Sequence, residues 1–140
     1  ATKLLLRLEQ VRAPEARAAV VWLAAWEPAG SSEPPESDEA ARKLCRLAPE
    51  VLRRAAAGFA AEADLTKLQL LNSCAKMHLR GWQSPAVCAP LYAYVAALAL
   101  ADASHDVRDR ARALSALVPP PPADGAAPAG DSPPGLAPQA

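Results

Sequence analysis

The sequence predicts an all-α protein built as an α-solenoid of stacked helical hairpins. Its 140 residues include 35 alanines and 19 leucines but no isoleucine, and aromatic residues make up only 4%, a composition that favours helix over strand. The apolar stripes recur at three- and four-residue spacing, and none alternates. Most connections between the predicted helices are short, which is typical of antiparallel helices packed side by side.

The first two predicted helices meet at Pro14. A proline disfavours helix in the residue before it and suits the first turn of a new helix. The second helix ends near Pro28 and Gly30, and its tryptophans, Trp22 and Trp26, are expected to pack in the core rather than bind a ligand. The residues expected to face inward in these helices are Leu4, Leu5, Leu8, Val11, Ala18, Val21, Trp22, Ala25 and Trp26.

An acidic segment follows, and we expect residues 27–38 to form a flexible loop. From Glu27 to Glu39 the chain holds five acids and no base among Pro, Gly and Ser, which is too polar to pack in a core. Ser37 or Asp38 is then a suitable N-cap for the next helix.

Pro49 is expected to restart the helix that begins at this cap, because a proline inside a helix removes a backbone hydrogen bond but suits a first turn. Arg53 and Arg54 lie off the apolar stripe that follows. The residues expected to face inward on the two sides of Pro49 are Ala41, Leu44, Cys45, Val51, Leu52, Ala55, Ala56 and Phe59.

The last three predicted helices begin near Glu62, at Pro85 and after the capping residue Ser104. The first of them runs to Leu79 and ends at Gly81, which suits a left-handed helix terminus. The residues expected to face inward are Leu65, Leu68, Leu71, Ala75 and Leu79 in the first, Val87, Leu91, Tyr94, Val95 and Leu98 in the second, and Val107, Ala111, Leu114 and Leu117 in the third.

The predicted helical domain covers residues 1–118, and we expect residues 119–140 to be a disordered Pro/Ala/Gly-rich linker. Eight of the 15 prolines lie in this tail. The run from Pro119 to Pro122 could dock in an SH3-type groove, but a polyproline spacer is the simpler interpretation.

The charge balance and the cysteines narrow the expected partners and the expected compartment of the protein. With 15 basic and 15 acidic residues the net charge is zero, so we expect no nucleic-acid partner. Three cysteines at unrelated spacings, with no secretory leader, indicate free thiols in the cytoplasm. Gly81 to Ala101 is 21 residues without a charge, but its polar residues, prolines and alanines favour a buried helix over a membrane span.

No arrangement of residues predicts an enzyme, a metal site or a cofactor. Cys74 and His78 share a helix face and would supply two zinc ligands, yet no further ligands stand at metal-site spacing, so a buried thiol and an interfacial histidine are expected instead. Neither a catalytic triad nor a glycine-rich phosphate loop is indicated.

The densest charge cluster runs from Asp106 to Arg112. Ion pairs are expected from Asp106 to Arg110 and from Asp109 to Arg112, with the acids at the helix start where the macrodipole favours them. Arg108 belongs to the same run. A phosphate or lipid site is the lesser alternative to ion pairs within or between repeats.

Five segments of the chain are informative as an ordered set. They are residues 16–23 (ARAAVVWL, which includes Trp22), 47–54 (LAPEVLRR), 64–72 (DLTKLQLLN), 75–79 (AKMHL) and 105–112 (HDVRDRAR). In this order they resemble the C-terminal part of a β-adaptin trunk, most closely that of the β subunit of adaptor protein complex three. The resemblance covers roughly Leu4 to Val118.

This resemblance implies a fragment of a HEAT/armadillo-like trunk, in which Pro49 starts a helix, the leucine stripe of residues 65–71 lies in an inner helix, and Asp106, Arg108, Asp109 and Arg110 begin the terminal helix. It implies a non-catalytic scaffold subunit of a heterotetrameric vesicle-coat adaptor, sorting cargo from the trans-Golgi network and endosomes toward lysosome-related organelles. The implied partners are a second large, a medium and a small chain and an Arf-type GTPase, with peripheral membrane association and a cytoplasmic location.

Two alternatives stay open at this stage. One is a coat subunit of a neighbouring adaptor complex or of coatomer, which shares the helical scaffold. The other is a HEAT/armadillo-like binding module for peptides or nucleic acid outside vesicle coats. A longer reading frame would separate them, because a long upstream trunk and a downstream appendage are expected only for a large adaptin.

Limited proteolysis should cut first within residues 27–38 and 119–140. Neither segment buries enough apolar side chain to offset about 1–2 kcal/mol of backbone entropy per ordered residue. Hydrogen exchange provides a second measurement, and protection of these segments equal to that of residues 65–79 would contradict the prediction.

Overall fold

The computed structural model describes residues 2–26, 38–81 and 85–122. These residues form helices and their connections with no β-strand among them, which confirms the all-α prediction. The elements in chain order are α1 (Thr2–Leu6), the 3-10 helix η1 (Leu8–Gln10), α2 (Pro14–Ala24), α3 (Glu39–Ala57), the 3-10 helix η2 (Phe59–Ala61), α4 (Asp64–Arg80), α5 (Pro85–Leu100) and α6 (His105–Leu117).

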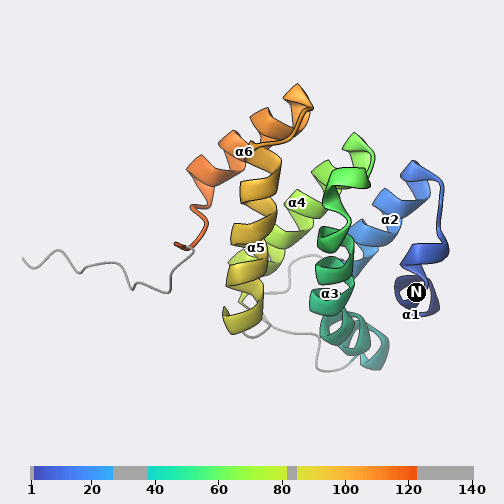
Figure 1. The fold of residues 1–140 in the computed structure, drawn as a ribbon. Coiled ribbons are helices and arrows are strands. Elements are labelled where there is room, and N and C mark those ends of the chain that lie inside the picture. The colour runs from blue at the N-terminus through green and yellow to red at the C-terminus, as the bar shows by residue number, and fades with distance from the viewer. Residues whose placement is uncertain (1, 27–37, 82–84, 123–140) are drawn as a thin grey trace, which may run out of the picture.

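The helices stack in two layers (Figure 1). One layer contains α2, α4 and α6 and the other α1, α3 and α5. Each helix packs against the next helix along the chain and against the next helix of its own layer. This nearest-neighbour arrangement is that of an α-solenoid, as predicted. The contacts of α4 with α2 and α5 are the most extensive, so α4 is the centre of the described stack.

Three helix boundaries follow the predicted local signals. Pro14 is the first residue of α2. The Asp38 carboxylate caps α3 by accepting hydrogen bonds from the backbone N–H groups of Ala40 and Ala41 at 2.9 and 3.2 Å. Gly81 ends α4 with a φ of 62°, a left-handed conformation that glycine adopts without steric strain.

Pro49 does not restart a helix, because α3 runs through it without a break. That prediction was wrong although the proline removes one backbone hydrogen bond, at a cost of about 3 kcal/mol. Leu44 and Ala48 before it, and Val51 and Leu52 after it, are all buried. Burial of these side chains on both sides of the proline offsets the lost hydrogen bond and holds α3 against its neighbours.

The leucine stripe predicted for α4 is only partly internal. Leu71 is fully buried and Leu68 half-buried, but Leu65 and Leu79 are 51% and 65% exposed, so the prediction was wrong at both ends. Because α2 and α5 cover α4 from different sides, its neighbours rather than its hydropathy decide which side chains are buried. The others buried in this helix are Thr66, Lys67, Leu70, Ser73, Cys74, Ala75 and Met77.

Periodicity also misassigned single positions of other helices, although Leu91 and Val95 of α5, for example, are buried as predicted. α5 contains no charged residue and is apolar all round, so the spacing of its side chains does not identify an inner face. The residues predicted to be internal but exposed are Leu4, Trp22, Val87, Tyr94 and Leu117, whereas Val20, Ala24, Cys88, Tyr92, Ala96 and Ala99 are buried.

Two predicted segments lie mostly outside the described residues. Of the acidic loop, residues 27–38, only Asp38 is described, and of the linker, residues 119–140, only the run from Pro119 to Pro122. The described chain therefore extends four residues past the predicted boundary at Val118. None of the described helices, α5 included, is long and apolar enough to cross a bilayer.

Leu71→Asp should lower the free energy of unfolding by several kcal/mol, because it places an unpaired carboxylate where the side chain is fully buried. Urea denaturation followed by far-ultraviolet circular dichroism measures this change.

Leu79→Asp is the matched control in the same helix. Its side chain is 65% exposed, so we expect a change within about 0.5 kcal/mol. Equal losses in the two variants would contradict the burial pattern of α4.

Candidate scaffold site

Arg17 connects α2 to the segment that leads into α4. Its guanidinium pairs with the Glu62 carboxylate, with Nε 2.8 Å from one oxygen. It also donates hydrogen bonds to the carbonyls of Leu8 and Val11 at 2.8 and 2.9 Å. The hydrogen bond with Glu62 raises the pKa of Arg17 despite partial burial. One cation thus holds both the loop before its own helix and the loop before the next helix of the layer.

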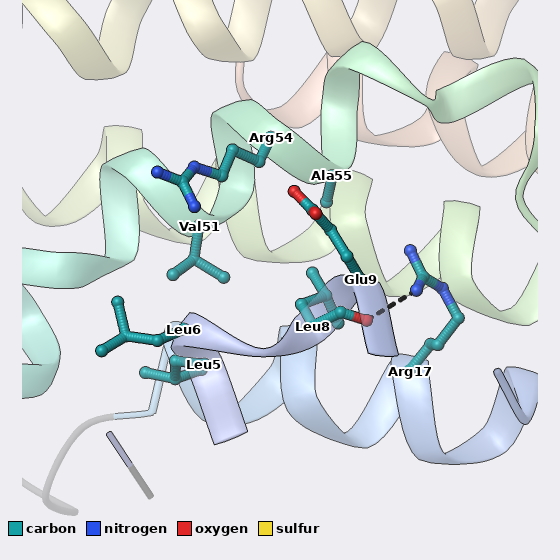
Figure 2. Close-up of a pocket in the computed structure, with 8 residues that line it drawn as sticks. All are labelled: Leu5, Leu6, Leu8, Glu9, Arg17, Val51, Arg54 and Ala55. Carbon is teal, nitrogen blue, oxygen red and sulfur yellow. Dashed lines mark hydrogen bonds between the residues drawn. The ribbon is translucent and has the colours of Figure 1, made fainter. Parts of the chain in front are cut away.

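A small cavity adjoins Arg17, and Figure 2 shows the guanidinium reaching from α2 to the Leu8 carbonyl. The cavity has a volume of about 30 Å³. Ligand pockets usually exceed about 300 Å³, so this space does not fit an organic ligand. Its lining residues come from α1, η1, α2 and α3: Leu5, Leu6, Leu8, Glu9, Arg17, Val51, Arg54 and Ala55.

Lys67 makes the equivalent connection from α4 to the segment before α6. Its Nζ lies 2.8 Å from an Asp102 oxygen, and the two side chains are only 9% and 7% exposed. The ammonium also lies 5.7 Å from the centre of the Phe59 ring, within the range of a cation–π interaction. The other Asp102 oxygen accepts a hydrogen bond from the Ser104 N–H at 2.9 Å.

The electrostatic surroundings of Asp102 favour its charged form. Burial alone would raise the pKa of this carboxyl, but the hydrogen bonds from Lys67 and from the Ser104 N–H, with the charges of Lys67 and Arg108, hold the pKa below its ordinary value. Ser104 is the N-cap residue of α6 as predicted, yet its side chain makes no capping hydrogen bond.

The three helices of this layer carry a cation at the same position. Arg17, Lys67 and Arg108 are each the fourth residue of their helix. Arg108 donates to the carbonyls of Asp102 and Ala103 at 2.6 and 2.8 Å, just as Arg17 binds carbonyls of the loop before α2. The same interaction therefore recurs in this layer: each of α2, α4 and α6 has a cation in its first turn that binds a neighbouring loop.

The charged run of α6 is mostly solvated. The predicted pair of Asp109 and Arg112 forms, at 2.8 Å between exposed side chains. The predicted pair of Asp106 and Arg110 does not, since no ion pair joins these exposed residues in the described part of the chain. Exposed partners gain little from pairing, because water already solvates both charges.

Cys74 and His78 do not form a metal site. His78 stacks on the Tyr92 ring at 5.3 Å between centroids, and burial raises the pKa of the Cys74 thiol far above neutral pH. A protonated, buried thiol is neither a good nucleophile nor a metal ligand. Within residues 2–26, 38–81 and 85–122, no three His, Cys, Asp or Glu side chains are grouped to hold a metal ion.

No protein-family model matches the chain. It is 34% identical over 112 residues to mouse AP-3 complex subunit beta-2, covering 80% of this chain and 9% of that protein. It is 33% identical over 113 residues to human AP-3 complex subunit beta-1, covering 81% of this chain and 9% of that protein. The chain contains a β-adaptin-like region. It spans only 9% of the length of these relatives.

Four of the predicted site residues lie on α2 and α4, and they fall into two groups. Leu68 and Leu71 pack inside the stack, whereas Trp22 and Leu65 are each 51% exposed on the layer of α2 and α4. The ion pairs Arg17–Glu62 and Lys67–Asp102 were not predicted from the sequence. Lys67 lies within the leucine stripe of residues 65–71, and a lysine in an apolar stripe is a sign of a buried ion pair. Both relatives are named as subunits of a complex.

Asp102→Asn should lower the free energy of unfolding at neutral pH by about 3–5 kcal/mol, because it leaves the Lys67 ammonium buried without its counter-charge. The pKa of Asp102 is lower in the folded chain than in the unfolded chain, where it is about 4. The ion pair therefore makes its full contribution to the free energy of unfolding above that pH. As the pH falls through the folded pKa, the native chain loses the contribution and the difference from the variant shrinks. Denaturation at a series of pH values measures this dependence.

Asp109→Asn provides the control, because its exposed pair with Arg112 is worth less than about 1 kcal/mol. A pH-independent difference between the native chain and Asp102→Asn would contradict the assignment.

Proposed function

We propose that this chain is part of the non-catalytic scaffold of a β-type large subunit in a heterotetrameric vesicle-coat adaptor complex. The observation that carries the proposal is the similarity to AP-3 beta-1 and beta-2 subunits over four-fifths of the chain. On this proposal, residues 1–118 belong to an adaptin-type helical trunk, and the function is cargo sorting and intracellular protein transport.

The proposed partners are the second large, medium and small chains of such a complex and an Arf-type GTPase. On this proposal the chain acts on the cytoplasmic side of Golgi and endosomal membranes. It associates with these membranes peripherally, through the complex, and serves transport routes toward lysosome-related organelles. The names of the relatives, subunits of the AP-3 complex, support membership of a multi-subunit assembly.

The geometry fits the proposed scaffold role. A scaffold must keep its binding surfaces at fixed spacing, and the two interhelix ion pairs specify how successive helices of one layer align. The same layer exposes Trp22, Leu65 and Leu79. Large apolar side chains on a rigid surface are typical of the centres of protein interfaces.

A segment exchange in mouse AP-3 complex subunit beta-2 tests the proposal. The segment aligned with this chain is replaced by the corresponding part of the chain, and the tagged chimera is purified from cells. We expect the other AP-3 subunits to co-purify with the chimera at a ratio close to that of the mouse protein. A chimera carrying Leu71→Asp should lose most of them, because the packing of α4 fails.

Leu117→Asp is the matched control, since Leu117 is 80% exposed at the end of α6 and its substitution should leave the fold intact. Circular dichroism of the isolated chain with each substitution separates unfolding from loss of binding. A chimera whose exchanged segment folds but which recovers no AP-3 subunit would contradict the proposal and favour a binding module outside vesicle coats.

A further inference from the structure

The outer side of α3 carries a row of cations that neither the core nor the proposed adaptor role uses. The helix holds five basic and two acidic side chains, so positive charge is in excess. They recur every three or four positions and therefore share one side of the helix, opposite the buried Leu44, Ala48 and Val51. This row, the basic ridge, consists of Arg42, Lys43, Arg46, Arg53 and Arg54, with Glu39 and Glu50 on the same side.

The carboxylate of Glu50 shows which ligand the ridge accepts. Arg53 binds it in a bidentate pair, in which Nε and Nη2 donate to separate oxygens at 2.8 and 2.9 Å. Arg54 donates from its Nε to one of these oxygens at 2.8 Å. The hydrogen bonds from Arg53 and Arg54 lower the pKa of Glu50 to about 2 although its side chain is partly exposed. Guanidinium groups of the ridge thus bind a carboxylate in contact with water.

The ridge has more cations than its own carboxylates neutralise. Glu39 pairs with Arg42, and Glu50 pairs with the two arginines at the other end. Between these pairs lie Lys43 and Arg46, three positions apart and both exposed. No carboxylate among the residues that the structure describes pairs with either of them. These two cations can therefore receive carboxylates from another chain.

The shape of the charged row favours an acidic polypeptide over a membrane. α3 lies between α1 and α5 in its layer (Figure 1), and α5 has no charged residue, so on that side the charge ends with α3. From Arg42 to Arg54 the row is about 18 Å long, a distance that about six residues of extended chain span. A flat anionic bilayer would also meet Glu39 and Glu50 on the same side, and like charges repel.

We propose that the basic ridge of α3 docks an acidic, extended segment of a partner protein, whose carboxylates pair mainly with Lys43 and Arg46. Four of the five cations are arginines, and the planar guanidinium matches a carboxylate better than an ammonium does. Clusters of arginine are a recurring way in which proteins bind acidic motifs. The proposal does not depend on the adaptor assignment, and its test needs no adaptor subunit.

The test uses the full 140-residue chain and a labelled peptide of about eight residues, alternating glutamate with serine, which in extended form spans the ridge. Fluorescence anisotropy at low ionic strength should show binding to the native chain. Replacing Lys43 and Arg46 together with glutamate should weaken this binding at least about tenfold, because the ridge then has more acidic than basic side chains. A peptide with glutamine in place of glutamate should bind the native chain at least about tenfold more weakly.

Arg46→Glu alone is compared with Arg110→Glu, a matched control at an exposed position of α6 in the other layer. Both substitutions change the net charge equally, but only Arg46→Glu should weaken binding of the peptide. Circular dichroism confirms the helical fold of each variant. Lys43→Gln combined with Arg46→Gln decides the result if the glutamate variants do not fold.

Four outcomes would overturn the proposal. The first is that the glutamate peptide does not bind the native chain. The second is that Arg110→Glu weakens binding as much as Arg46→Glu, which would show general attraction between opposite charges. The third is that the glutamine peptide binds equally well. The fourth is that the chain sediments with vesicles of phosphatidylcholine and phosphatidylserine through Lys43 and Arg46 but does not bind the peptide, which would assign the ridge to a membrane.

Discussion

The fold depends on a cation and a carboxylate that are separated in sequence by nearly the whole α4–α5 hairpin and meet where its two ends come together. Lys67 and Asp102 are almost fully buried, and a buried charge is very costly unless it is paired and hydrogen-bonded. α4 therefore aligns with the loop before α6 at one register only. Arg17 and Glu62 set the same constraint one hairpin earlier. Apolar packing alone would tolerate small slips along the helix axes, whereas these pairs do not.

The remaining contacts of that layer reinforce the same register. The Thr66 hydroxyl donates to the Pro14 carbonyl at 3.3 Å, and the buried Ser73 hydroxyl donates to the Val21 carbonyl at 3.4 Å. Both bonds run from α4 to α2. The layer of α2 and α4 is thus joined by polar contacts along its length. In the other layer, the described residues of α1, α3 and α5 meet mainly through apolar side chains.

Local signals in the sequence predicted the helices, and the tertiary contacts decided which faces they bury. Proline, glycine and capping residues act within a few positions of themselves, so Pro14, Asp38 and Gly81 could be interpreted without knowing the fold. Leu65 and Tyr94 could not, because α4 and α5 are apolar on several sides and only their neighbours select the inner one. The interhelix ion pairs join residues 45 and 35 positions apart, beyond the reach of any helical repeat.

The difference between the layers makes the stack mechanically asymmetric. The layer of α2, α4 and α6 resists sliding because displacement along the helix axes would separate buried charges. The layer of α1, α3 and α5 has less extensive contacts between its helices, and apolar side chains exchange neighbours at little cost during a small shear. When such a stack bends, the spacing between α1, α3 and α5 changes most, and the spacing between α2, α4 and α6 stays nearly constant. In a longer superhelix built in this way, the curvature would change because the helices of one layer, the one that corresponds to α1, α3 and α5, move apart or together.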